Sequence, residues 1–162
     1  MKIRPATRED TNVLAALKQT VHDLHATTRP DFFKFHTDEG AKAEFEQLFE
    51  RENVRILLAS SERTPIGYMV LFIVNRPEDA LRMARKTLYI DQISVKEEYQ
   101  GRGCGKALIE AAKALARESK LDRVELDFWS FNERARRFFA SQGFVTITEK
   151  MALELEPIQL SV

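Results

Sequence analysis

Gln100-Gly101-Arg102-Gly103-Cys104-Gly105 is the stretch of sequence that decides the fold, because it places three of the six glycines in five positions. A strand-like run at 88–95 precedes it and a helix-like run at 106–115 follows it. Glycine permits a positive backbone φ and a close approach to a ligand. The first turn of a helix presents unpaired N–H donors at the positive end of its dipole. The stretch therefore predicts a socket for an anion such as a phosphate or pyrophosphate.

The strand that leads into this loop breaks its own period. Leu88 and Ile90 lie two residues apart, as do Ile93 and Val95, but three residues separate the two pairs. A regular strand would put the pairs on opposite faces. One extra residue near 91–92 would realign them, as a β-bulge does, and would splay the strand from its neighbour. A strand buried on both faces is the alternative that the pattern leaves open.

Hydrophobic periodicity and turn residues predict the remaining elements. A helix is expected to begin after Thr7, a candidate N-cap with Asp10 three residues on, and to stop before Pro30. The expected helices cover 13–24, 37–51, 106–115 and 132–141. The expected strands cover 2–5, 54–59, 66–75, 86–95, 123–129 and 144–155, with a turn at 60–65 that makes a hairpin. This order predicts a mixed α/β sheet.

Length and composition indicate one domain spanning 1–162. The 25 basic and 25 acidic side chains balance, so no global field draws the protein to nucleic acid or to an acidic membrane. The single cysteine, Cys104, cannot form an internal disulfide, which fits a reducing cytosol. We see neither a secretory leader nor an apolar run of the ~20 residues that a membrane span needs. We therefore expect a cytoplasmic protein without nucleic-acid or membrane partners.

Two common phosphate-binding loops do not fit the glycine stretch. No Gly-Lys-Ser/Thr triplet ends it, as a Walker A loop requires, and it lies mid-chain after three strands, unlike a dinucleotide-binding loop. A kinase-like nucleotide site would also need a lysine and magnesium ligands that are lacking. Taken alone, a glycine-rich tight turn and an anion site are equally open interpretations.

Two segments together resemble the GNAT N-acetyltransferases. Residues 99–108, Tyr-Gln-Gly-Arg-Gly-Cys-Gly-Lys-Ala-Leu, resemble motif A (Gln/Arg-x-x-Gly-x-Gly/Ala), which binds the pyrophosphate of acetyl-coenzyme A. Residues 131–144 resemble motif B (Asn-x-x-Ala-x-x-x-Tyr-x-x-x-Gly-Phe), and the order and separation of the motifs match too. The resemblance covers most of the chain. It implies a GNAT fold: a mostly antiparallel sheet of six or seven strands, flanked by four helices and split between the third and fourth long strands.

The resemblance also implies that acetyl-coenzyme A binds along the loop and the splayed strand. The amide near Ile93 would polarise the acetyl carbonyl, an oxyanion-type contact. The splayed strand, Ile93, Ser94 and Val95, would pair with the pantetheine arm. Backbone N–H groups of the loop would hold the pyrophosphate: Gln100, Gly101, Arg102, Gly103, Cys104, Gly105 and Lys106.

Motif B implies the opposite wall of the cofactor site. Asn132 would hydrogen-bond the cofactor, and Ala135, Phe138 and Phe139 would lie along the pantetheine or the acetyl group. The alternative role for Asn132 is a plain N-cap, and one side chain could serve both purposes. Core packing is the alternative role for the Phe138–Phe139 pair.

Phe139 departs from the family, because many members have at its position a tyrosine that protonates the departing thiolate. A positioned general acid is typically worth ~10²–10⁴-fold in rate. Water or another hydroxyl would have to substitute, and Ser130, Ser141 and Tyr99 are the candidates. The departure weakens the case for fast catalysis more than the case for cofactor binding. An acyl-coenzyme A sensor or interaction module with little turnover is therefore the alternative function.

Asp91 is the first candidate for the general base that deprotonates an amine acceptor, directly or through water. It lies on the splayed strand near the place where the family often has a carboxylate, and Gln92 follows where members often carry a second acid. A solvated or bulge-stabilising aspartate is an equally open interpretation. Cys104 is interpreted as a small loop residue whose backbone matters, since a covalent mechanism would want a paired base.

The acceptor pocket is expected where the family usually builds it, between the first two helices. His25, Phe32 and Phe33 are the candidates, although the two phenylalanines would equally anchor the second helix. The histidines lack a convincing third metal ligand, so no metal is expected. The predicted reaction moves an acetyl group directly to a primary amine in a ternary complex. The acceptor stays open between a small-molecule amine and a protein N-terminus or lysine, and a homodimer is possible because the family commonly dimerises.

Overall fold

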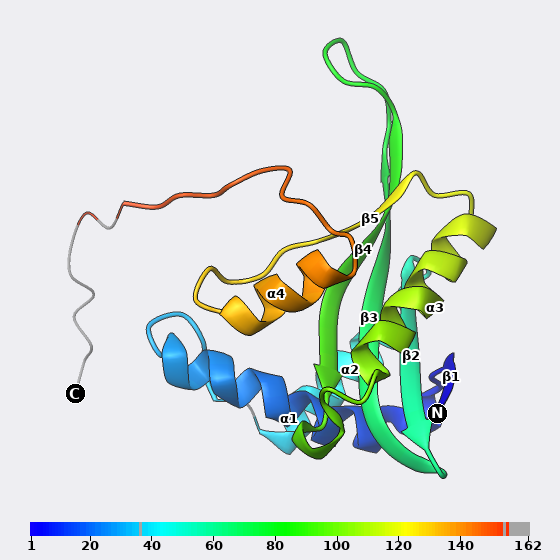
Figure 1. Cartoon of the computed structure of the whole chain (residues 1–162), viewed down its shortest axis with the longest axis vertical. Coiled ribbons are helices and arrows are strands. Elements are labelled where there is room, and N and C mark those ends of the chain that lie inside the picture. The colour runs from blue at the N-terminus through cyan, green and yellow to red at the C-terminus, as the bar shows by residue number, and fades with distance from the viewer. Residues whose placement is uncertain (36, 154, 156–162) are drawn as a thin grey trace.

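The computed structural model describes residues 1–35, 37–153 and 155 of the 162-residue chain, without the side chains at 20–22, 24 and 25. Within those residues, one five-stranded sheet runs in the order β1-β2-β3-β4-β5 (Figure 1). The first four strands are antiparallel and β5 joins β4 in parallel, so the predicted mixed, mostly antiparallel sheet is confirmed. The strands are β1 (Lys2–Pro5), β2 (Val54–Ser61), β3 (Thr64–Arg76), β4 (Arg85–Val95) and β5 (Arg123–Leu126).

Helices cover both faces of this sheet. Ile56 and Leu58 of β2 pack into a core cluster with α1 and α2, whereas Leu57 between them packs into a cluster with α3 and α4. Because successive strand residues point to opposite faces, the two helix pairs lie on opposite sides of the sheet. The helices are α1 (Thr11–Thr28), α2 (Asp38–Phe49), α3 (Cys104–Glu118) and α4 (Glu133–Ser141), with short 3-10 helices η1 (Arg8–Asp10) and η2 (Glu97–Tyr99).

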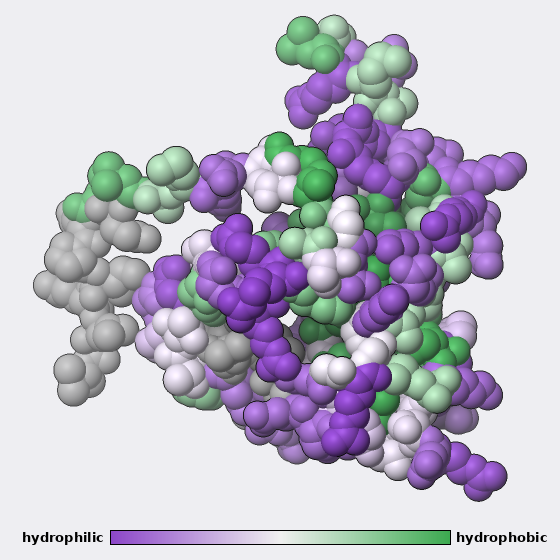
Figure 2. Space-filling view, in the orientation of Figure 1, coloured by the Kyte–Doolittle hydropathy of each residue, from purple (hydrophilic) through white to green (hydrophobic). Residues whose placement is uncertain are grey.

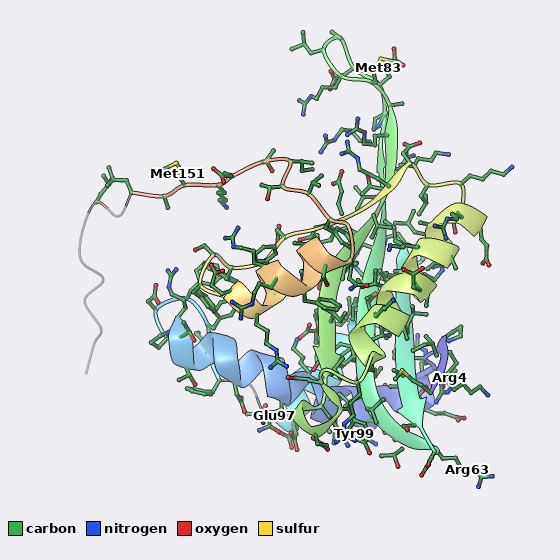
Figure 3. The ribbon with its side chains drawn as sticks, viewed as in Figure 1. Arg4, Arg63, Met83, Glu97, Tyr99 and Met151 are labelled. Carbon is green, nitrogen blue, oxygen red and sulfur yellow. The ribbon has the colours of Figure 1, made fainter. Side chains whose placement is uncertain are left out.

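Two hairpins join the three central strands. The predicted β2–β3 hairpin is confirmed, but its turn is only Glu62 and Arg63, both at positive φ (48° and 73°). Such a two-residue turn matches the twist of paired strands, which therefore extend further than the sequence pattern suggested. The β3–β4 hairpin projects from the body, with Met83 near its tip (Figures 1 and 3).

The predicted bulge in the third long strand is confirmed. Val70 pairs with Gln92 whereas Leu71 pairs with Ile90, so Asp91 is the extra residue of β4. Beyond the bulge β4 loses its other neighbour, because β5 pairs only from Thr87 to Ile90. The sheet is thus split between β4 and β5, as expected, and the split opens at Asp91.

The start of the first helical segment also follows the prediction. The backbone N–H of Thr7 donates to Asp10 Oδ2 at 2.8 Å, which closes a capping box before α1. Arg4 donates two hydrogen bonds of 2.7 Å to the Asp10 carboxylate. These bonds hold the pKa of Asp10 at about 2, below its ordinary value of 3.8.

We expect the Arg4–Asp10 pair to make stability pH-dependent in acid. A carboxylate with a depressed pKa stabilises the fold fully above its unfolded pKa and loses that effect as the pH falls through its folded pKa. Asp10→Asn should therefore lower the free energy of unfolding by about 1 kcal/mol at neutral pH, a value discounted because Arg4 is partly exposed. The difference should shrink as the pH falls from about 4 towards 2. Urea unfolding of both proteins across this range measures it, and a constant difference would contradict it.

The strand predicted at 144–155 is wrong for 144–153 and 155, while position 154 lies outside the described residues. Residues 144–153 are extended and lead away from the body, but no described strand lies beside them to accept their backbone hydrogen bonds (Figure 1). The described sheet therefore has five strands in place of six or seven. Likewise β5 ends at Leu126, short of the expected 129, because its pairing with β4 stops at Ile90, immediately before the bulge at Asp91. Among the described residues, none of the helices combines the length and apolar character that crossing a bilayer requires.

Candidate active site

The glycine loop forms an open cradle of backbone donors at the start of α3. Gly101 and Gly103 have positive φ (73° and 85°), and Gly103 is the N-cap of the helix. The first backbone bond of the helix runs from Ala107 N to Gly103 O, so the N–H groups of 101–106 have no acceptor among the described residues. A Cβ at Gly101 or Gly103 would meet nothing within 4 Å. The space beside these two glycines is therefore open, and N–H donors without an acceptor are what an anion site requires.

Gln100 links the loop to the free end of β4. Its Nε2 donates to Val95 O at 2.7 Å, whereas its Oε1 is buried without a partner among the described residues. A buried acceptor without a donor is costly, so this oxygen is a place where a ligand N–H would be favourable. Tyr99 lies just before the loop, with the Arg102 guanidinium 5.9 Å from its ring (Figure 3).

Helix α4 supplies the opposite wall of the split. A Cβ on Gly105 would lie 2.9 Å from Phe138 Cζ, so the missing side chain lets the Phe138 ring rest on the first turn of α3. Asn132 Oδ1 accepts a 3.0 Å hydrogen bond from Ala135 N, which makes Asn132 the N-cap of α4. The cap leaves the Asn132 amide nitrogen without a partner among the described residues. Phe139 is only 6% exposed and sits in the core among Phe128, Phe138 and Phe144.

The strand residues expected at the cofactor are differently placed. Ile93 and Val95 pack beside the α3–α4 cluster, at the border of the split. Ser94 is buried on the other face, where its hydroxyl donates to Leu17 O of α1 at 2.9 Å. Ser94 can therefore reach the split only with its backbone. Cys104 is also buried, and this burial raises the pKa of its thiol, so helix-end activation of a nucleophile does not apply.

Asp91 stands at the mouth of the split, in an acidic environment. Partial burial raises the pKa of its carboxyl, and the nearby Glu44 and Asp127 carboxylates raise it further. Gln92 Nε2 donates to Asp91 Oδ2 at 3.3 Å, and this hydrogen bond lowers the pKa of Asp91. The positive charge of Lys18 lowers that pKa as well. The geometry provides a carboxylate that takes up a proton more readily than an ordinary aspartate.

Gln92 connects this carboxylate to a part-buried hydrogen-bond network. Its Nε2 donates to Glu44 Oε1 at 2.8 Å, and its Oε1 accepts from the Tyr68 hydroxyl at 2.9 Å. Glu44 in turn pairs with Lys18 of α1. The network ties β4 to both α1 and α2, so it holds the bulge in place. Desolvation raises the pKa of Tyr68 well above its ordinary value, which leaves the phenol as a donor.

An aromatic cluster joins two loops that are distant in sequence. The Trp129 ring lies 5.0 Å from Phe32 and 5.3 Å from Phe33, both edge-on, and Arg29 lies 5.2 Å above the same indole. The cluster thus bridges the α1–α2 loop and the β5–α4 loop. Phe32 nevertheless remains 64% exposed. The side chain of His25 lies outside the described residues, and no group of three metal-ligating side chains occurs in the described part of the chain.

The pairing of a glycine cradle with a split β4–β5 edge matches the expectation from motifs A and B. A family model described as the acetyltransferase (GNAT) family matches residues 21–144. The chain belongs to the GNAT family. The GNAT fold predicted from the sequence is therefore confirmed, with the strand count corrected to five in the described residues.

Similar proteins place this GNAT chain among acetyltransferases. An uncharacterized N-acetyltransferase in the pepI 3′ region of Lactobacillus delbrueckii subsp. lactis is 37% identical over 62 residues, which are 38% of this chain and 36% of that protein. The match thus spans well under two thirds of that relative. A tetramutant of BH1408 from Bacillus halodurans is 33% identical, with a TM-score of 0.90 over 96% of this chain and 100% of that one. AAC(6′)-Iy in complex with the bisubstrate analogue CoA-S-monomethyl-acetylneamine has the same fold, with a TM-score of 0.71 at 17% identity over 96% and 97% of the chains.

The structure of this GNAT protein adds residues that sequence reasoning missed. Glu44 and Asp127 approach Asp91 from α2 and from the end of β5, and Trp129 meets Phe32 and Phe33. No motif marks these three positions. Only the alternation of β5 hinted at Asp127 and Trp129, because it places both on the face opposite Val124 and Leu126. The roles of the residues predicted from motifs A and B stay predictions and are developed below.

Proposed function

We propose that the protein is a cytoplasmic, single-domain GNAT enzyme that transfers an acetyl group from acetyl-coenzyme A directly to a primary amine. The observation that supports this most is the open run of N–H donors at 101–106 beside the unpaired edge of β4. Bound acetyl-coenzyme A supplies an activated acetyl thioester. An amine that attacks it forms a C–N bond as the C–S bond breaks and coenzyme A leaves as a thiolate.

In this proposal the glycine cradle binds the diphosphate. The donors of 101–106 and the positive end of the α3 dipole face one anion, which is the arrangement that helix N-termini provide for phosphates. The free backbone of Ile93, Ser94 and Val95 pairs with the pantetheine arm. Asn132 donates its spare N–H from the opposite wall, and Ala135 and Phe138 give an apolar surface. Phe139 supports that surface from the core.

Residues of β4 stabilise the developing charge on the acetyl oxygen and accept the proton of the acceptor amine. The amide near Ile93 donates to the acetyl oxygen as negative charge develops there. Asp91 accepts a proton from the acceptor ammonium, which gives the neutral amine that attacks. The thiolate takes its proton from water or from a nearby hydroxyl, and the proton that the attacking nitrogen loses as the amide forms restores that donor. Ser141 donates its hydroxyl to Phe138 O, so Tyr99 and Ser130 are the candidates that remain.

The second candidate function is binding of acyl-coenzyme A without useful turnover. One observation favours it, since the family's tyrosine position is the buried Phe139, which has no proton to donate. Thiol release measured with a panel of primary amines, alongside calorimetric binding of coenzyme A, separates the two functions. Turnover with any amine supports the enzyme. Tight binding without turnover supports the module, and absence of both would overturn the assignment.

The acceptor in this proposal is a cationic amine with an apolar part. Glu44, Asp91 and Asp127 surround the mouth of the split with negative charge, which favours an ammonium group. Phe32, Phe33 and Trp129 provide aromatic faces where the α1–α2 and β5–α4 loops meet. AAC(6′)-Iy, which shares the fold, was solved with the bisubstrate analogue CoA-S-monomethyl-acetylneamine. We propose as the acceptor either a small-molecule amine or a protein N-terminus or lysine. We also propose that the protein forms a homodimer.

Trp129→Leu should raise the KM for the acceptor about three- to tenfold, because an aromatic contact is worth roughly 0.5–1.5 kcal/mol beyond its buried area. The affinity for coenzyme A should not change. Phe35→Leu is the control, since Phe35 is an exposed aromatic residue of the α1–α2 loop that makes no ring contact among the described residues. Steady-state kinetics of both variants with the best amine of the panel test this, and equal effects at the two positions would contradict the pocket.

A further inference from the structure

A small pocket lies on the sheet where the β3–β4 hairpin leaves the body. Its volume is about 220 Å³, and residues of three strands line it: Val74, Arg76, Arg85, Thr87, Tyr89 and Glu125. These side chains lie on the face that carries α1 and α2, because they alternate with Ile73, Leu88 and Val124 of the α3–α4 cluster. Val74 is 42% exposed, so the two helices leave this end of the face open. Figure 2 shows hydrophilic residues, in purple, at the base of the hairpin.

Two arginines line this pocket side by side. Arg76 of β3 pairs directly with Arg85 of β4 in the strand register. Neither side chain has an ion-pair or hydrogen-bond partner in the described part of the chain. Like charges at opposed strand positions repel, so an anion held between the two guanidinium groups would stabilise the hairpin. The planar fork of arginine donors suits a carboxylate in particular.

The carboxylate that lines the same pocket, Glu125, is already paired. Its Oε1 lies 2.9 Å from Arg123 Nε, on the neighbouring position of the same face of β5. Arg82, a further arginine of the hairpin, pairs with Asp79 at 3.3 Å and does not line the pocket. The pocket therefore keeps a surplus of positive charge, which a carboxylate from outside would neutralise.

Tyr89 joins the pocket to the acidic mouth of the split. Burial raises the pKa of its hydroxyl, and a hydrogen bond with the Asp127 carboxylate and the nearby charge of Asp91 raise it further. The phenol is thus close to both carboxylates while its ring lines the pocket. This face of the sheet carries negative charge at one end and positive charge at the other. Such a pattern complements a molecule that has an ammonium group and a carboxylate.

The separation of the two ends requires an extended molecule. Arg85 precedes Asp91 by six residues along β4. A strand of that length spans roughly 20 Å, which a free amino acid does not bridge. An extended peptide bridges it within about four to six residues, because the arginine and acidic side chains reach toward each other. The pocket is also smaller than the ~300–1,000 Å³ of sites that enclose a whole ligand, so it suits a single side chain.

The sheet face leaves one direction open for a chain that starts at Asp91. Away from the arginines it is covered, because Gln92 Nε2 donates to Glu44 Oε1 of α2. Further along β4, the Ser94 hydroxyl donates to Leu17 O of α1. A terminal amine needs room for the chain on one side only, whereas an internal lysine needs room on both sides. The geometry therefore favours the N-terminus of a peptide over an internal lysine.

We propose that the acceptor is a peptide N-terminus with an acidic side chain at about position four to six, whose carboxylate binds between Arg76 and Arg85 while its amine lies at Asp91. This inference deepens the proposed acetyl transfer and rests on it, because Asp91 marks the amine end. The two arginines bind and position the acceptor, whereas the proton transfer stays with Asp91.

Acetylation of a matched peptide series tests the proposal. The peptides are alanine-rich and C-terminally amidated, and each carries a single glutamate at one position from two to six, or glutamine at position five. With wild type, kcat/KM for glutamate at position five should exceed that for glutamine about tenfold or more, as expected for charge-assisted hydrogen bonds to an arginine pair. Glutamate at position two should give no such gain, because it cannot reach the pocket.

A double variant and a charge-matched control assign the preference to the pocket. Arg76→Gln combined with Arg85→Gln should reduce the glutamate-to-glutamine ratio to about one and leave kcat/KM for the glutamine peptide unchanged within about twofold. Arg63→Gln combined with Arg82→Gln removes the same net charge outside the pocket and should keep the preference. Circular dichroism checks that each variant is folded.

Peptide binding distinguishes failure of this inference from failure of the proposed function. Fluorescence anisotropy of the labelled position-five glutamate peptide, with coenzyme A present, should show about tenfold weaker binding to the Arg76/Arg85 variant than to wild type. Binding that depends on the arginines without any acetylation would support the pocket and contradict acetyl transfer. Acetylation without a glutamate preference, or with one that survives loss of both arginines, would overturn the pocket and leave acetyl transfer standing. An arginine-dependent preference for 6-aminohexanoate over the peptides would contradict the extended acceptor.

Discussion

Gly103→Val should weaken coenzyme A binding by about 100-fold or more. Gly103 has a φ of 85°, which a β-branched residue adopts only at considerable cost. The valine would pull the loop out of its left-handed turn and misalign the N–H groups of 101–106. Losing two charge-assisted hydrogen bonds of roughly 1.5 kcal/mol each accounts for a change of this size. Isothermal titration calorimetry with coenzyme A measures it directly.

Gly143→Val is the matched control for backbone strain. Gly143 has nearly the same φ, 88°, and a Cβ there would also meet nothing within 4 Å. It ends α4 instead of lining the cradle, so the two variants should lose similar thermal stability while only the Gly103 variant loses affinity. Equal affinities in wild type and Gly103→Val would remove this loop from the binding site and would leave the proposed function without its main support.

Local sequence signals predicted the elements around the cradle, because each has a short-range cause. The parity break between Ile90 and Ile93 required one extra residue, and the bulge indeed lies at Asp91. The glycines at the strand-to-helix junction predicted a turn with positive φ, which Gly101 and Gly103 make, and Asn132 predicted the cap of α4. These features depend on backbone preferences within a few residues, so a single sequence suffices to find them.

Features made by distant segments were not predictable in this way. Trp129 meets Phe32 because the α1–α2 and β5–α4 loops converge, and no spacing rule connects such positions. Glu44 approaches Asp91 through Gln92, which only the packing of α2 on the sheet brings about. The expected strand at 144–155 failed for the opposite reason. Its local pattern is correct, but a strand also needs a neighbour, and the described chain supplies none.

Asp91→Asn should lower kcat/KM for the acceptor amine by about 10²–10⁴-fold, the usual contribution of a positioned general base. Asparagine keeps the shape and the contact with Gln92 but cannot accept the ammonium proton. The affinity for coenzyme A should stay unchanged, because the diphosphate site is formed by the loop at 101–106. Thiol-release kinetics together with calorimetry separate the two effects.

The pH profile provides the decisive readout for this variant. A general base works only when deprotonated, so activity should fall as the pH drops through the pKa of Asp91. Partial burial raises that pKa above its ordinary 3.8, and Glu44 and Asp127 raise it further. The acid limb of the wild-type activity profile therefore lies at a higher pH than that of an ordinary aspartate. The limb should vanish in Asp91→Asn. Asp127→Asn, which removes one of those neighbours, should keep most of the activity and shift the limb to lower pH. If Asp127→Asn abolishes the activity instead, while Asp91→Asn retains both rate and limb, the base is Asp127 and the proton path runs along the end of β5.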